Sequence, residues 1–175
     1  INSSLPMLQV MGLFCMIQGD LRGLGMVCLG IAALAAAVIA GSPVIASDAA
    51  ADAVQREGAI FERQSIMDQL DKDGELLGNI AAGIEPPEKL GEVTCSIANG
   101  ARDSVVSFRS ILPGGRSKPE VWSNHADFMQ RMETFARDAE AMAKAGESGD
   151  MAAVSALMVS AMPCKQCHDL YRAPK

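Results

Sequence analysis

The residues of this chain with the clearest capacity for chemistry are two cysteines and a histidine near its last residue. Cys164 and Cys167 are separated by two residues, and His168 follows directly, in the run Cys-Lys-Gln-Cys-His. This spacing is the attachment signature of c-type haem, in which both thiols form thioethers to the porphyrin and the imidazole binds the iron. On a helix, residues three and four apart share a face, so all three side chains can address one flat ring. A thioredoxin-like redox pair, half of a zinc site and a structural disulfide are the alternatives for the same cysteines.

The composition of the chain favours a single helical domain. Its 175 residues are 49% apolar but only 4% aromatic, and the net charge is −6. An acidic protein lacks the clustered Lys and Arg that phosphate contacts need, so we expect no nucleic-acid partner. We also expect no enzymatic activity, because no nucleophile with a base and no glycine-rich phosphate loop is apparent. An acidic run that we interpret as a solvated helix face contains Asp68, Asp71, Asp73 and Glu75.

An export signal is predicted ahead of the domain. The apolar run 24–40 follows Arg22 and precedes small residues up to Ala46, a pattern typical of a secretory signal peptide. We therefore expect residues 1–46 to be removed and residues 47–175 to be an exported domain. Because haem is joined to thiols outside the bacterial cytoplasm, export and the cysteine motif support each other. A retained membrane anchor is the competing interpretation, since the run is at the short limit for a membrane span.

The first residues carry a second apolar patch, 5–17. An over-extended reading frame would explain it, with the true start at Met7, Met11 or Met16. N-terminal sequencing of the mature protein tests both expectations, and a first residue well before Ser47 would contradict them.

Four segments with helical apolar periodicity follow the signal. They cover residues 50–82, 88–112 and 125–145, and a fourth segment begins after Asp150, a suitable N-cap. Glycine or proline ends each of the first three. Four amphipathic segments joined by short connections predict an all-α, antiparallel four-helix bundle.

The cysteine motif lies on the inner face of the fourth segment. Cys164 and His168 continue its apolar stripe, so we expect whatever they bind to lie inside the bundle. No strand precedes the motif, which removes the main support for a thioredoxin-like pair. Pro163 removes a backbone hydrogen bond to the carbonyl of Val159, and we expect it to break the fourth helix or to start a fresh helical turn.

Three short stretches then point to one family. They are Arg-Gln-Ser-Ile-Met at 63–67, Lys-Pro-Glu-Val-Trp at 118–122 with Asp-Phe at 127–128, and the motif at 164–168 followed by Tyr-Arg at 171–172. In these stretches the chain resembles the cytochrome c-prime family, the class II c-type cytochromes. The resemblance implies a haem-containing four-helix bundle in the periplasm, and often a homodimer.

The resemblance also implies roles for individual residues. One haem c would be attached through Cys164 and Cys167. Arg63 and Gln64 would lie near the haem propionates, and Arg172 near the proximal face.

The residue that faces the iron opposite His168 decides the function. A thioether there gives low-spin iron with a raised potential, suited to electron transfer, whereas a vacant site lets the iron bind a small gas. In an up-down bundle the end of the fourth helix neighbours the starts of the first and third, which leaves Met67, Met129 and Met132 as candidates. Met67 lies on the core stripe and matches the family's distal position, so we predict it as the sixth ligand. His125 precedes the third helix, and we interpret it as a surface residue.

The sequence therefore predicts a periplasmic electron-transfer protein with His168 and Met67 as iron ligands. Its partners would be periplasmic redox proteins and, as the resemblance implies, a second copy, with membrane contact only if the N-terminal segment is retained. The alternative is a five-coordinate haem protein that binds or sequesters NO or CO. A bundle without haem, with a thiol or disulfide role, is a third hypothesis.

Overall fold

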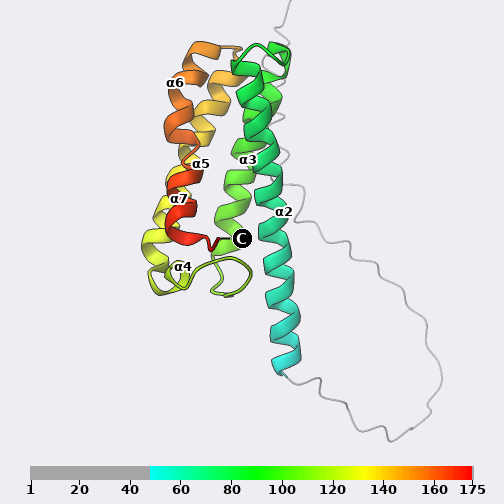
Figure 1. The fold of residues 1–175 in the computed structure, drawn as a ribbon, viewed down its shortest axis with the longest axis vertical. Helices are drawn as coiled ribbons and strands as arrows, with labels where there is room; N and C mark the ends of the chain where they lie inside the picture. Colours follow the sequence, from blue (N-terminus) through cyan, green and yellow to red (C-terminus); the bar gives the residue numbers. More distant parts are fainter. Residues whose placement is uncertain (1–47, 175) are drawn as a thin grey trace, which may run out of the picture.

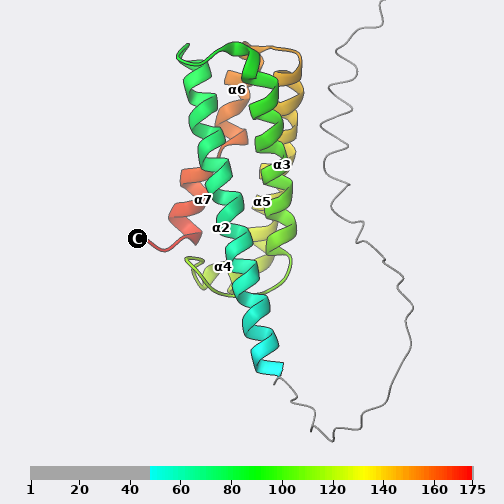
Figure 2. The same cartoon turned by 90° about the vertical axis from the view of Figure 1, so that its right-hand side faces the viewer.

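The helices of the structure follow the apolar periodicity of the sequence. The computed structural model describes residues 48–174, and its consecutive long helices run antiparallel as a four-helix bundle, as predicted (Figures 1 and 2). Within this range the sole β-type pairing is an isolated bridge between Ser117 and Arg172. The predicted signal segment, 1–46, lies outside the described residues. The elements are α2 (Asp48–Ala81), η2 (Pro87–Lys89), α3 (Leu90–Phe108), α4 (Glu120–Ser123), α5 (His125–Glu147), α6 (Met151–Ala161) and α7 (Cys164–Tyr171).

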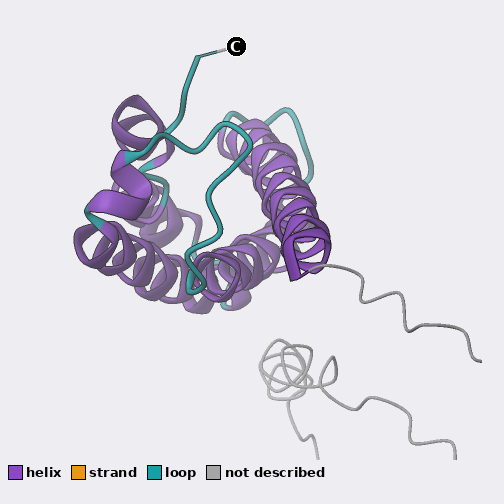
Figure 3. Cartoon of the chain, turned by 90° about the horizontal axis from the view of Figure 1, so that it is seen from below, coloured by secondary structure: helices purple, strands orange, loops and turns teal. Residues whose placement is uncertain are grey.

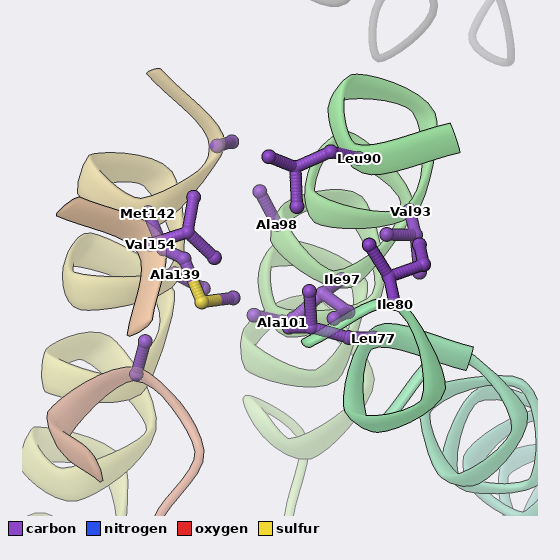
Figure 4. Packing of buried hydrophobic residues seen from close by; sticks show 12 residues of the cluster. Leu77, Ile80, Leu90, Val93, Ile97, Ala98, Ala101, Ala139, Met142 and Val154 are labelled. Atoms are coloured by element: carbon purple, nitrogen blue, oxygen red, sulfur yellow. The ribbon is translucent and has the colours of Figure 1, made fainter. Parts of the chain in front are cut away.

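No helix in residues 48–174 has both the length and the apolar character needed to cross a membrane. Apolar side chains fill the interior of the bundle at the end opposite α4. Leu77 from α2, Ile97 from α3 and Met142 from α5 are fully buried there, together with Val154 from α6 (Figure 4). Burial of such side chains contributes about 1.5–3 kcal/mol each.

The second helix is shorter than the sequence predicted. It ends at Phe108 instead of continuing to residue 112, and residues 109–119 form a loop. The reason is non-local: the side chain of Arg63 donates hydrogen bonds to the carbonyls of Ser107, Ser110 and Leu112. These bonds satisfy carbonyls at the helix end that would otherwise lack a partner.

Asp73 corrects the prediction of a solvated acidic face. Its carboxylate is buried and accepts hydrogen bonds from Ser96 Oγ at 2.7 Å and from Gln69 Nε2 at 2.9 Å. The other three acidic residues of the run are exposed, as expected. A buried carboxylate is tolerated here because polar partners on α3 and α2 satisfy it.

The fourth helix consists of two parts. Asp150 caps α6 by accepting a hydrogen bond from the backbone N–H of Ala153, as predicted. Helix α6 ends at Ala161, and α7 begins at Cys164, so the predicted break at Pro163 is confirmed. Pro163 lies just before the first residue of α7 instead of within its first turn, and its carbonyl accepts a hydrogen bond from the N–H of Cys167. In Figure 1, α7 continues roughly below α6.

Candidate haem-binding site

A cavity lies at the end of the bundle where α4 is found. Its volume is about 170 Å³, and its walls come from α2, α3, α4, α5, α7 and the loop 109–119. Figure 3 views this end from below, where loop segments cross between the helices. The predicted site residues that line it are Arg63, Gln64, Met67, Cys167, His168 and Arg172, and the other lining residues are Ile60, Asp68, Phe108, Gly114, Gly115, Arg116, Ser117, Val121, Phe128, Met132 and Tyr171.

The two cysteines of the motif are free thiols in this structure. Cys164 is exposed and absent from the cavity wall, contrary to the inner face predicted for it, whereas Cys167 is partly buried and lines the cavity. Burial raises the pKa of both thiols above the ordinary value. A redox-active cysteine has the opposite property, a lowered pKa that favours the thiolate. Within residues 48–174, no three His, Cys, Asp or Glu side chains gather as a metal site.

His168 faces the same cavity as a half-buried imidazole. Burial lowers its pKa, and the positive charges of Arg172 and Arg116 lower the pKa further. The neutral imidazole, which is the form that binds a metal, is therefore favoured.

Two methionines line the cavity from other helices. Met67 comes from α2 and Met132 from α5, whereas His168 comes from α7. Met129 packs in the neighbouring apolar cluster and is absent from the cavity wall. His125 is half-buried instead of lying on the surface, because its Nε2 lies 2.8 Å from the carbonyl oxygen of Phe108. The structure therefore places Met67 and Met132 in the cavity wall, and leaves His125 and Met129 out of it.

Arg63 has a structural role that sequence reasoning missed. The residue is 5% exposed, and its Nε, Nη1 and Nη2 donate to the carbonyls of Ser107, Leu112 and Ser110 at 3.0, 2.7 and 3.2 Å. The group also lies 4.5 Å from the ring centre of Phe108. Burial lowers the pKa of Arg63. Three of the five guanidinium N–H donors are thus used by backbone carbonyls, while the residue still lines the cavity.

A further arginine, Arg116, lines the cavity without having been predicted. Its Nε and Nη2 donate to the carbonyl of Ala173 at 3.1 and 2.7 Å, which joins the loop to the residues after α7. Sequence periodicity carries no information on a loop residue of this kind. With Arg63 and Arg172, it gives the wall three arginines against one carboxylate, Asp68. This excess of positive charge suits a ligand that carries carboxylates.

Tyr171 joins α7 to α5. Its hydroxyl donates a 2.7 Å hydrogen bond to Oδ2 of Asp127, and Nε of Arg131 donates to the same oxygen at 2.8 Å. The buried tyrosine ring meets the ring of Phe128 edge-on, with 5.0 Å between centres. Burial and the hydrogen bond to Asp127 raise the pKa of Tyr171. The sequence contained this tyrosine within a motif but gave no role for it.

Such an arrangement defines a class of protein. A four-helix bundle whose C-terminal Cys-x-x-Cys-His faces an apolar cavity with an arginine-rich wall is a c-type haem protein of the all-α kind. The family model for Cytochrome C' matches residues 58–172, and the chain belongs to that family. As a member it binds haem c covalently.

Two curated relatives agree with this assignment. A cytochrome c' from Alcaligenes xylosoxydans xylosoxydans is 35% identical over 70 residues, 39% of this chain and 55% of the relative. A cytochrome c' from Rubrivivax gelatinosus is 35% identical over 60 residues, 34% of this chain and 46% of the relative. The chain thus spans about half the length of the curated relatives it matches.

Solved structures show the same fold. The ferric cytochrome c prime from Alcaligenes xylosoxidans superposes with a TM-score of 0.63 at 24% identity, covering 69% of this chain and 97% of that one. A nitric oxide complex of a mutant cytochrome c prime from the same organism gives the same values.

The residues around the cavity fit the cofactor. Two free thiols three residues apart would hold the porphyrin, and the neutral imidazole beside them is a suitable axial ligand. The arginines of the wall offer positive charge to the two propionates.

Proposed function

We propose that this protein is a periplasmic electron carrier. Its haem is attached through Cys164 and Cys167, and its axial ligands are His168 and Met67. The observation that supports this best is that His168 on α7 and Met67 on α2 line one cavity from separate helices. When bound, the haem supplies a one-electron redox couple.

The chain's own residues would set the potential of the haem and shield it from water. The neutral imidazole of His168 is ready to bind without losing a proton. The apolar side chains of Val121, Phe128 and Met132 reduce access of water to the cavity. The thioether of Met67 is a ligand of the kind that raises a haem potential.

The proposal includes export and partners. The apolar run 24–40 with its small-residue cleavage pattern supports a periplasmic location. Periplasmic redox proteins are the partners that this function needs, and the family resemblance supports a homodimer. Arg63, Gln64 and Arg172, which line the cavity, are proposed to lie beside the haem, with Arg116 added to them.

Spectra of the ferric protein test the ligand set. We expect low-spin iron in the wild type, high-spin iron in Met67→Leu, and unchanged low-spin iron in Met132→Leu, the matched control from the same cavity wall. A high-spin wild type would exclude the electron-carrier proposal. A denaturing gel stained for haem, with Cys164→Ala and Cys167→Ala beside the wild type, tests the attachment.

Binding of NO or CO is the second candidate function. It is favoured by the cavity volume of about 170 Å³ beside Met67 and by the nitric oxide complex of the structurally similar cytochrome c prime mutant. If it is correct, the ferric wild type is high-spin and the ferrous protein binds CO without displacement of a ligand.

A further inference from the structure

We propose that Asp127 and Tyr171 are positioning residues that set the orientation of His168. The inference rests on the proposed function, since it takes His168 as the iron ligand. Neither residue touches the iron in this proposal; they act on the helix that carries the histidine.

The first observation is that α7 is not a continuous extension of α6, so α6 alone does not fix the position of α7. The backbone of Met162 is outside the helical region, with φ −130° and ψ 60°, and Pro163 has no N–H to donate. Helical hydrogen bonding is therefore interrupted between the two helices. A helix of eight residues is too short to be stable alone, so its contacts with other elements must hold it.

The backbone contacts of α7 with the loop gather at its C-terminal end. Lys118 N–H donates to the carbonyl of Tyr171 at 2.9 Å, and Ala173 N–H donates to the carbonyl of Arg116 at 2.8 Å. These bonds hold the last turn against the loop. Nζ of Lys118 adds a bond to the carbonyl of Asp169 at 2.9 Å. Because these bonds lie close to the axis of α7, side-chain contacts further from the axis have more leverage on its rotation.

The hydrogen bond between Tyr171 and Asp127 restrains that rotation. Tyr171 follows His168 by three residues, so both side chains lie on one face of α7, and both line the cavity. Turning His168 away from the cavity would carry the Tyr171 hydroxyl away from Asp127 Oδ2, which is 2.7 Å distant. The bond is charge-assisted, and Arg131 holds the carboxylate at 2.8 Å.

Variants of Tyr171 and Asp127 can distinguish a role in orienting His168 from a role that only stabilises the fold. We would prepare the full-length holoprotein as Tyr171→Phe, which keeps the ring contact with Phe128, and as Asp127→Ala. The matched control is Asp138→Ala, which removes an exposed ion pair with Arg137 from the same helix α5. The readouts are the paramagnetically shifted haem methyl resonances in ferric proton NMR, which report the orientation of the axial imidazole, and amide hydrogen exchange.

We expect the pattern of methyl shifts to change in the same direction in Tyr171→Phe and Asp127→Ala, with no additional change in the double variant. Exchange at the amides of Lys118 and Ala173 should accelerate roughly 5- to 30-fold, the effect of losing one hydrogen bond of this kind. Asp138→Ala should match the wild type in both. Unchanged methyl shifts in Tyr171→Phe and Asp127→Ala would overturn the proposal, even if exchange accelerates.

A further variant tests the role of the helix break. Pro163→Ala should leave the methyl shifts unchanged, because α7 is held by its own contacts. If Pro163→Ala changes the shifts and Tyr171→Phe does not, α6 sets the orientation and the proposal is wrong. A wild-type protein without covalent haem, or without resonances from a coordinated histidine, would instead show that the proposed function has failed.

Discussion

Nη1 of Arg63 donates a 2.7 Å hydrogen bond to the carbonyl oxygen of Leu112, and this bond joins the first helix to a loop far away in the sequence. Together with the bonds to Ser107 and Ser110, it holds the loop that forms one wall of the cavity. Arg63 therefore builds the site as well as lining it.

Arg63→Lys should destabilise the fold while retaining the positive charge. Lysine cannot make three diverging hydrogen bonds of this geometry or stack as a plane on Phe108, so we expect the free energy of unfolding to fall by about 2–4 kcal/mol. Guanidinium chloride unfolding of the holoprotein measures it. Arg137→Lys is the control, since that residue makes one exposed ion pair, and its effect should stay within about 0.5 kcal/mol. Equal effects of the two substitutions would contradict this account of Arg63.

Met67→Leu should lower the midpoint potential of the haem. Leucine has nearly the same volume, so the fold persists, but the thioether that we propose as the sixth ligand, which would favour the reduced state, is lost. Spectroelectrochemical titration measures the change against Met132→Leu, whose potential should remain close to that of the wild type. A larger shift in Met132→Leu would make that residue the ligand instead.

The stability contributed by Asp127 should disappear in acid. Hydrogen bonds from Arg131 and Tyr171 lower the pKa of the Asp127 carboxyl in the folded protein. The unfolded chain therefore binds this proton more readily, so the contribution is present at neutral pH. It is lost as the pH falls below about 4, the ordinary value, and through the lowered folded-state pKa.

Unfolding of the wild type and of Asp127→Asn at a series of pH values checks this expectation. The wild type should be the more stable at pH 7, and the difference between the two proteins should narrow towards pH 3. A difference that does not vary with pH would show that the charge of Asp127 is not the source of its effect.

Two glycines in helices should respond in opposite ways to alanine. A Cβ at Gly146 would clash with Oγ1 of the buried Thr94, so Gly146→Ala should cost at least about 2 kcal/mol of unfolding free energy. A Cβ at Gly78 meets nothing within 4 Å, so Gly78→Ala should stabilise the protein by roughly 0.5–1 kcal/mol. Thermal unfolding of the pair measures both, and destabilisation by Gly78→Ala would count against the helix geometry described for α2.

Local patterns predicted much of this structure. The apolar periodicity located the long helices, Asp150 marked the start of α6, and Pro163 marked the break before the cysteine motif. Each of these signals depends only on residues close together in the chain, so it can be recognised from a single sequence. The apolar stripe correctly placed His168 on the inner face of α7, but it was wrong for Cys164, which is exposed, whereas Cys167 lines the cavity.

Features that depend on distant partners were not predicted. The end of α3 at Phe108 depends on Arg63, and the burial of Asp73 depends on Ser96 across the helix interface. Arg116 reaches the cavity because its loop pairs with the residues after α7, and periodicity has no bearing on that pairing. Such contacts become visible only when the helices are packed.

The interruption at Met162 and Pro163 divides the fourth helix into two units with different tasks. Val154 and Ala161 of α6 are fully buried and complete the core, whereas α7 carries the residues that receive the cofactor. Because no helical hydrogen bonding joins the two, we expect α7 to open and close as a small unit of its own while the core stays folded. On that expectation, covalent loading of the protein would not require the bundle to unfold.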